Sequence, residues 1–206
     1  RVDITTRDVL TVAGLAGAAG TVLDGVGGAA RFKNPHGLCM VGTDLYIVDA
    51  ATDIGGGARL RRMDTGTFAV TTLASFPAGI YSVVEDVAYD GSSAFLVSAN
   101  PGRIFKVTQG TWAVSDYLGT GAPACTTVGP GTGTGAWINR AHDIVFDPTY
   151  TYFYVTDYNN WHVKQGVYAA ASVSIISAYC AGPGLCAAGT GTAARYRMPC
   201  GIDRDT

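Results

Sequence analysis

Four residues with metal-binding side chains recur along the chain at nearly even intervals. His36, Glu85, His142 and Cys200 are separated by 49, 57 and 58 residues. Imidazole, carboxylate and thiolate groups are all ligands for transition metals. Residues so far apart can share a site only if the intervals between them fold into repeated units around a common centre.

The segments that contain these four residues are copies of one another. Residues 27–38, 133–144 and 191–202 align without gaps, and a degenerate fourth copy surrounds Glu85. A repeat of this length indicates that each interval folds into one supersecondary unit. The four residues therefore occupy the same position in successive units.

Each interval carries the same pattern of short segments rich in β-branched and aromatic residues, which is typical of strands. First strands are expected at 37–41, 86–89 and 143–146, and strongly apolar second strands at 45–49, 94–98 and 153–157. The third strands, 59–63, 103–107 and 162–166, are more polar and are placed nearer the rim. Fourth strands are expected at 70–73, 114–118 and 173–176, with a counterpart from a preceding unit at 9–13.

Four antiparallel strands per repeat, arranged radially, form a blade of a β-propeller. The predicted fold is an all-β partial propeller of about three full blades and parts of two others. The predicted boundaries are 1–14 for the last strand of a preceding blade, 15–78 for blade one, 79–119 for blade two, 120–180 for blade three and 181–206 for the start of a fourth. Propellers have about four to eight blades, so we expect more sequence in the complete protein.

The glycine-rich segment 24–37 with its Asn-Pro-His-Gly ending, and the second strands Tyr46-Ile-Val-Asp and Tyr154-Val-Thr-Asp, resemble the NHL-repeat family of propellers. The resemblance covers essentially the whole chain. Blade two departs from it, because it lacks the Pro-x-Gly step and has Ser98 where the others have Asp. The resemblance implies a disc with a central channel lined by the first strand of each blade.

Within that fold, His36 and His142 are expected on innermost strands two blades apart, with their imidazoles toward the axis. Together they are candidate zinc ligands, and Glu85 and Cys200 are the local candidates for completing the coordination. The alternative is structural, because a His after Pro in this motif is ordinary in NHL blades and bonds channel water or neighbouring backbone. No catalytic residue is assigned, and no cofactor is expected other than zinc in the channel.

Five cysteines are too few for a disulfide scaffold and show no C-x-x-C spacing. Cys180 and Cys186 flank a Gly-Pro-Gly turn that can bring them within bonding range, so a disulfide is one prediction, and free, partly buried thiols are the alternative. Cys39 is expected between sheets, because strand alternation places it on the opposite face from His36. A disulfide implies an oxidising compartment, which is why an extracellular or cell-surface location is expected.

Three other sequence features are interpreted as structural, and one of them also fits a partner contact. The glycine pattern at 25–30 does not lie in a βαβ unit, which a dinucleotide site requires. Asp49 and Asp157 end their second strands, where an Asp commonly accepts hydrogen bonds from the amides of the following turn. The glycine-rich insertion at 53–58 fits a flexible loop and also a partner contact.

Composition narrows the function classes. The net charge is −2 and the basic residues are scattered, apart from Arg59, Arg61 and Arg62, so nucleic acid is not an expected partner. No stretch has the about 20 apolar residues of a membrane span. We expect a non-catalytic module that binds a protein, peptide or glycan on a loop-bearing face. The alternative is a metal-dependent lyase, since the chain is similar to peptidylglycine amidating lyases in the channel histidines His36 and His142.

Overall fold

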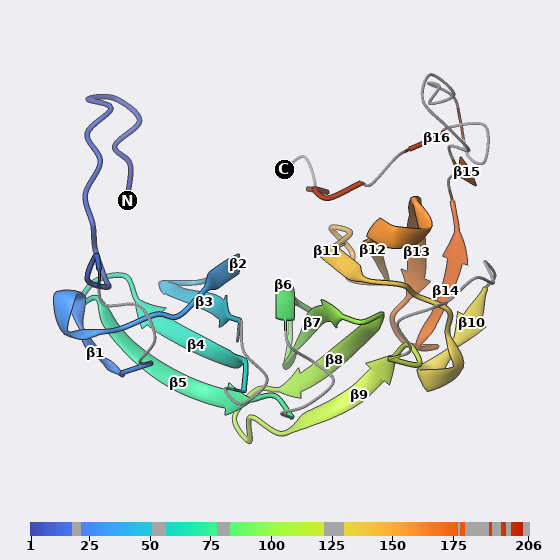
Figure 1. The fold of residues 1–206 in the computed structure, drawn as a ribbon, viewed down its shortest axis with the longest axis horizontal. Helices are drawn as coiled ribbons and strands as arrows, with labels where there is room; N and C mark the ends of the chain where they lie inside the picture. The colour runs from blue at the N-terminus through green and yellow to red at the C-terminus, as the bar shows by residue number, and fades with distance from the viewer. Residues whose placement is uncertain are drawn as a thin grey trace.

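The computed structural model describes residues 1–17, 22–50, 57–77, 83–121, 130–176, 178–179, 190, 195–196 and 199–203. Within these residues every regular element is a strand or a single 3-10 turn. The strands form three large antiparallel sheets that follow one another around an arc (Figure 1). The all-β partial propeller expected from the sequence is thus observed, and each large sheet is one blade.

The strands of each blade run in sequence order from the concave side of the arc outward. Blade one contains β2 (Pro35–Val41), β3 (Asp44–Asp49), β4 (Arg59–Asp64) and β5 (Ala69–Ser75). Blade two contains β6 (Val83–Tyr89), β7 (Ala94–Asn100), β8 (Arg103–Thr108) and β9 (Val114–Leu118). Blade three contains β11 (Ala141–Phe146), β12 (Tyr152–Asp157), β13 (His162–Val167) and β14 (Ser172–Ile175). The predicted strands are confirmed, with ends that differ by no more than three residues.

Two blades gain a fifth strand from the glycine-rich segment that precedes them. The two-residue strand β1 (Gly25–Val26) pairs with β5, and β10 (Gly131–Thr132) pairs with β14. Each is followed by a 3-10 turn, η1 (Gly27–Ala29) or η2 (Gly133–Gly135), that begins at a glycine with φ near +50°. The chain thus meets the outer edge of the blade before it crosses to the inner strand, which explains why the glycine-rich motif repeats.

The described ends of the chain contain little regular structure. The strand expected at 9–13 is not formed, and a single bridge joins Val2 to Val9. Beyond blade three, β15 (Ala178–Tyr179) and β16 (Arg195–Tyr196) form a short parallel pair. The segment 199–203 then returns to the concave side of the arc (Figure 1).

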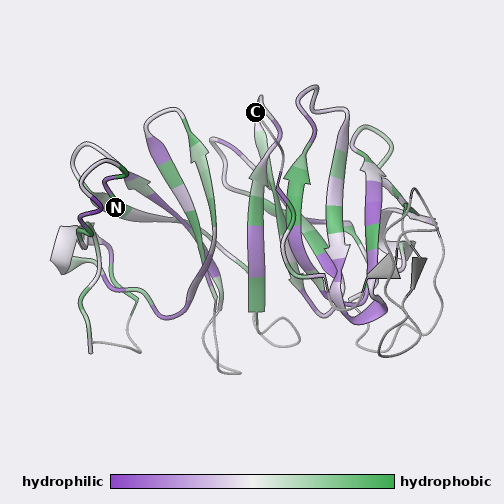
Figure 2. Ribbon diagram, turned by 90° about the horizontal axis from the view of Figure 1, so that it is seen from above, coloured by the Kyte–Doolittle hydropathy of each residue, from purple (hydrophilic) through white to green (hydrophobic). Residues whose placement is uncertain are grey.

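Apolar side chains fill the spaces between blades. One cluster joins blade one to blade two through residues such as Tyr46, Phe95 and Phe105, and a second joins blade two to blade three through Leu96, Ile144 and Phe153. Figure 2 shows apolar bands along the strands of the blades. The blades are therefore held face to face by hydrophobic burial, which fixes the inner strands β2, β6 and β11 beside one another.

Candidate functional site

A β-bulge interrupts each inner strand at the position that the sequence repeat singled out. The pairing register shifts between Pro35 and Leu38 in β2, between Val84 and Val87 in β6, and between Ala141 and Ile144 in β11. In each case two residues of the inner strand oppose one residue of the second strand. A bulge re-aims side chains, and the pairs displaced here begin with His36, Glu85 and His142.

Cys39 faces the neighbouring sheet, as expected, but the β-bulge rather than simple strand alternation places it there. His36 turns toward Glu85 of blade two, and Cys39 is half-buried against the cluster between blades one and two. Because the bulge adds one residue, both side chains point toward the same neighbouring blade. The expected burial of Cys39 is thus confirmed in part, although simple strand alternation does not produce it.

Glu85 is the centre of a cluster that joins three blades. Its side chain is 1% exposed, and one of its oxygens lies 3.1 Å from Nδ1 of His36. The other oxygen accepts a hydrogen bond from Nε of Arg140 at 2.9 Å and forms an ion pair with Nη2 of the same side chain, also at 2.9 Å. The Arg140 guanidinium lies over the Tyr158 ring at 4.8 Å, and the His142 ring stacks on the same tyrosine with centroids 5.4 Å apart. We call His36, Glu85, Arg140, His142 and Tyr158 the mouth cluster, because they lie where the inner strands begin.

The structure places the predicted metal candidates in different surroundings. His36 and Glu85 contact each other, whereas His142 contacts Tyr158, and Cys200 is exposed on the returning segment 199–203. Within the described part of the chain, no group of three or more His, Cys, Asp or Glu side chains could hold a metal ion. Zinc binding at His36 and His142 stays a prediction. Cys180, Cys186 and their predicted disulfide lie outside the described residues.

A cavity of about 620 Å³ follows the inner strands beyond the mouth cluster. Its walls are mixed, with Leu38, Met40, Ala88 and Val145 among the apolar residues and the carboxyl groups of Asp86 and Asp143 among the polar ones. The two aspartates occupy equivalent positions and perform the same task. Asp86 accepts a hydrogen bond from the Ile144 amide of the next blade at 3.1 Å, and Asp143 accepts one from the Ile202 amide at 2.7 Å.

These two carboxyl groups also interact with each other. Burial, and then a hydrogen bond and charge repulsion from Asp143, raise the pKa of Asp86 to about 8. Asp86 thus carries a proton at neutral pH and links blade two to blade three in its neutral form. Blade one has Gly37 at the equivalent position, and a Cβ there would lie 2.1 Å from Oδ1 of Asp86. Only glycine fits at that point.

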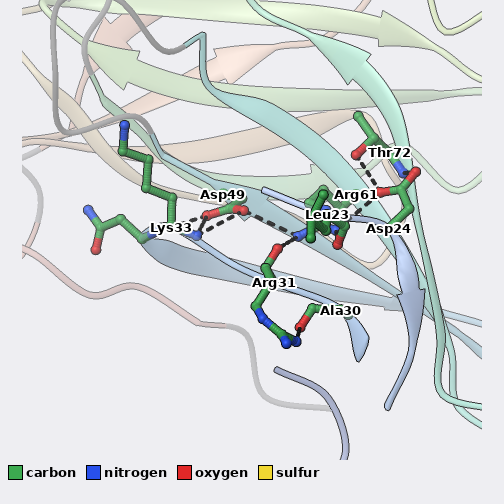
Figure 3. Close-up of polar contacts among 9 residues, drawn as sticks. Leu23, Asp24, Ala30, Arg31, Lys33, Asp49, Arg61 and Thr72 are labelled. Atoms are coloured by element: carbon green, nitrogen blue, oxygen red, sulfur yellow. Dashed lines mark hydrogen bonds and ion pairs between the residues drawn. The ribbon is translucent and has the colours of Figure 1, made fainter. Parts of the chain in front are cut away.

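Buried acid–base pairs lock blades one and three. Asp49 accepts hydrogen bonds from the amides of Lys33 and Asn34 at 3.0 and 2.8 Å, and its other oxygen lies 3.4 Å from Nη1 of Arg61 (Figure 3). The Arg61 side chain is fully buried and also donates to the carbonyl of Leu23. The described donors belong to the segment that leads into the inner strand. The turn that follows Asp49, at 51–56, lies outside the described residues, so the expectation that it also donates to Asp49 stays a prediction.

Blade three repeats this arrangement with different residues. Asp157 accepts a hydrogen bond from the Asn139 amide at 2.8 Å and pairs with Nζ of Lys164 at 2.8 Å, and both charged side chains are fully buried. Lys164 also donates to the Trp137 carbonyl, just as Arg61 donates to the Arg31 carbonyl. The strand order places β4 and β13 outside the second strands, as expected. Part of their polarity comes from cations that are buried inside the blade.

Blade two replaces the ion pair with an apolar pair. The register aligns Ala99 with Asp49 and Asp157, because Val84, Pro35 and Ala141 are their partners on the inner strands. By the same register, Phe105 stands where Arg61 and Lys164 stand, and it packs on Phe76 with centroids 5.3 Å apart.

Ser98 is therefore not the counterpart of Asp49 and Asp157, which end the second strands of blades one and three. Its hydroxyl accepts a hydrogen bond from the Asp86 amide, as Thr156 does from the Asp143 amide, each at 3.0 Å. Ser98 and Thr156 are therefore equivalent, and the alignment of Ser98 with Asp49 is off by one residue.

The comparisons with known proteins establish the fold. No family model and no curated protein matches the sequence. An auxiliary nutrient binding protein from Bacteroides thetaiotaomicron VPI-5482 is similar at 17% identity with a TM-score of 0.63, over 86% of this chain and 44% of that one. The structure of a nidogen/laminin complex is similar at 18% identity with a TM-score of 0.50, over 69% of this chain and 47% of that one. The chain thus spans less than half the length of either protein.

Proposed function

We propose that the chain belongs to a non-catalytic interaction module of the NHL propeller type, which binds a protein, peptide or glycan at the mouth cluster. The observation that carries the proposal is the convergence of partly exposed polar and aromatic groups from three blades on one buried carboxylate. His36 and Arg140 are 32% and 31% exposed, and Tyr158 is also partly exposed. Rigid rings beside fixed hydrogen-bonding groups are typical of recognition surfaces.

The other charged groups of the blade interiors have structural partners. Asp49, Arg61, Asp157 and Lys164 bond one another or the backbone inside a blade. The mouth cluster is different, because its groups come from separate blades and reach solvent. Two propellers with this fold, one in a nidogen/laminin complex and one described as a nutrient binding protein, are compatible with a binding role, although fold alone does not imply function.

Binding of an external ligand also suits the predicted location outside the cell or on its surface. No helix among the residues with described structure is long and apolar enough to cross a membrane. We propose an extracellular or cell-surface setting, which rests on the predicted bridge between Cys180 and Cys186.

The test uses the full-length protein on glycan and peptide arrays, with one variant on each face of the disc. Tyr158 follows the end of β12, and Tyr152 begins the same strand with 39% exposure, so the two tyrosines lie at opposite ends. We expect the wild type and Tyr152→Ala to bind the same probe, and Tyr158→Ala to lose at least about tenfold in affinity. The recovered probe should have an unchanged mass after incubation with zinc.

Three results would overturn the proposal: no probe on either array binds, the bound probe is cleaved when zinc is present, or Tyr152→Ala weakens binding as much as Tyr158→Ala. Cleavage would favour the metal-dependent lyase instead. Circular dichroism of both variants checks that the sheets are intact.

A further inference from the structure

Arg140 departs from the repeat in both conformation and contacts. Its φ is +75°, a left-handed conformation that is unfavourable for a residue with a Cβ. The equivalent residues, Asn34 in blade one and Val83 in blade two, have no such φ. Backbone strain at a single member of a repeat is a signal of function, since the fold itself does not require it.

The left-handed backbone sends the Arg140 side chain across to blade two. There Nε donates a hydrogen bond to one oxygen of the buried Glu85, Nη2 forms an ion pair with the same oxygen, and the Tyr158 ring supports the face of the guanidinium. Glu85 is held in turn by His36. The guanidinium is thus fixed in orientation before any ligand arrives, which lowers the entropy cost of binding.

One edge of the guanidinium remains unused. Nη1 of Arg140 makes no hydrogen bond with any residue that the structure describes, and the side chain is 31% exposed. An oriented arginine with a free edge is suited to a carboxylate, which it binds through charge-assisted hydrogen bonds.

We propose that Arg140 is the anchor of the mouth cluster for a carboxylate group on the ligand. Because the charge of Glu85 offsets that of Arg140, the site favours a monoanion over a dianion such as phosphate. Two sources share this chemistry, an acidic sugar and the C-terminus of a peptide. The inference rests on the proposed function and adds the ligand class.

The experiment is a ligand-observed NMR titration of the full-length protein with two acids and their neutral counterparts. Glucuronate is paired with glucose, and N-acetylglycine with N-acetylglycinamide. We expect one acid to bind at least about tenfold more tightly than its neutral counterpart, and this acid identifies the source. Arg140→Gln should abolish the preference, and Arg140→Lys should retain part of it because the charge remains.

Arg62→Gln is the matched control, since Arg62 is also partly exposed, at 42%, and pairs with Asp44 at 3.7 Å on the surface of blade one. Equal binding of acid and neutral probes, or equal losses in Arg62→Gln and Arg140→Gln, would overturn the inference. If a probe from the arrays still depends on Tyr158 while neither acid is preferred, the proposed function stands and the carboxylate assignment falls.

Discussion

Replacing Asp157 with alanine tests how blade three is held together. The substitution leaves the ammonium group of Lys164 in a position with no solvent exposure, and it removes the acceptor for the Asn139 amide and for the side-chain amide of Asn160. Breaking a buried pair from one side typically costs about 3–5 kcal/mol. We expect a loss of this size in the free energy of unfolding, and a similar loss for Lys164→Met.

The double variant should lose less than the sum of the two single variants. Blade two shows that this position tolerates an apolar pair, since Ala99 and Phe105 replace the ion pair there. Removing both charges leaves the amides of Asn139 and Asn160 and the Trp137 carbonyl without partners, at about 1–3 kcal/mol each. These losses are already part of the single variants, so the coupling between the two substitutions, which reports the unpaired charges, should be at least about 2 kcal/mol.

The assay is urea unfolding of the full-length protein followed by tryptophan fluorescence, with Trp161 next to β13 as a local reporter. Asp44→Ala is the control, because the exposed pair of Asp44 with Arg62 should contribute less than about 1 kcal/mol. Additive losses in the double variant, within about 0.5 kcal/mol, would refute the reasoning that the buried charges stabilise the blade by compensating each other.

Three further predictions concern the channel and the thiols. The pKa of Asp86 is raised from 3.8 to about 8 in the folded state, so its contribution to stability is fully present below about pH 4 and falls by up to about 1.4 kcal/mol per pH unit as the pH rises from about 4 to about 8. Asp86→Asn should therefore flatten the fall in melting temperature between pH 5 and 8, and an unchanged slope in this variant would contradict the prediction. Peptide mapping with and without reductant should find Cys180 linked to Cys186, whereas alkylation of both thiols in the native protein would exclude the bridge. If His36 is a zinc ligand, His36→Ala should sharply lower the metal content of the full-length protein with its circular dichroism intact, and unchanged stoichiometric zinc would reject it.

Much of the fold was predictable, because the repeat and the apolar second strands are properties of residue type. Segments such as 45–49 and 153–157 are rich in β-branched and aromatic residues, and the observed strands β3 and β12 coincide with them to within a residue. The equivalence of His36, Glu85 and His142 also holds in the observed register.

The mouth cluster was predicted only in part. The two bulged residues are His-Gly in β2, Glu-Asp in β6 and His-Asp in β11, so no shared residue type predicts the bulge from the sequence. Arg140 was missed because its role depends on a left-handed backbone and on a contact with another blade. Neither property is visible in a single repeat.

The buried ion pairs of blades one and three could have been predicted from the sequence. Arg61 and Lys164 both lie two residues after the start of a third strand, and both blades end the second strand with Asp. Aligning the third strands would have shown this covariation, together with its loss in blade two at Ala99 and Phe105. The polarity of those strands by itself predicts only a position nearer the rim, and it does not reveal that the cations are buried.

Hydrogen exchange of the full-length protein, with and without a bound array probe, tests most directly whether the mouth cluster is the binding surface. We expect slower exchange in the bound state for segments 34–37, 85–87, 139–143 and 158–160, which meet at the start of the inner strands. The hairpins at the opposite end, such as 42–43 and 148–151, should exchange at the same rate in both states. Protection confined to those hairpins or to the outer strands, with the mouth segments unchanged, would contradict the account.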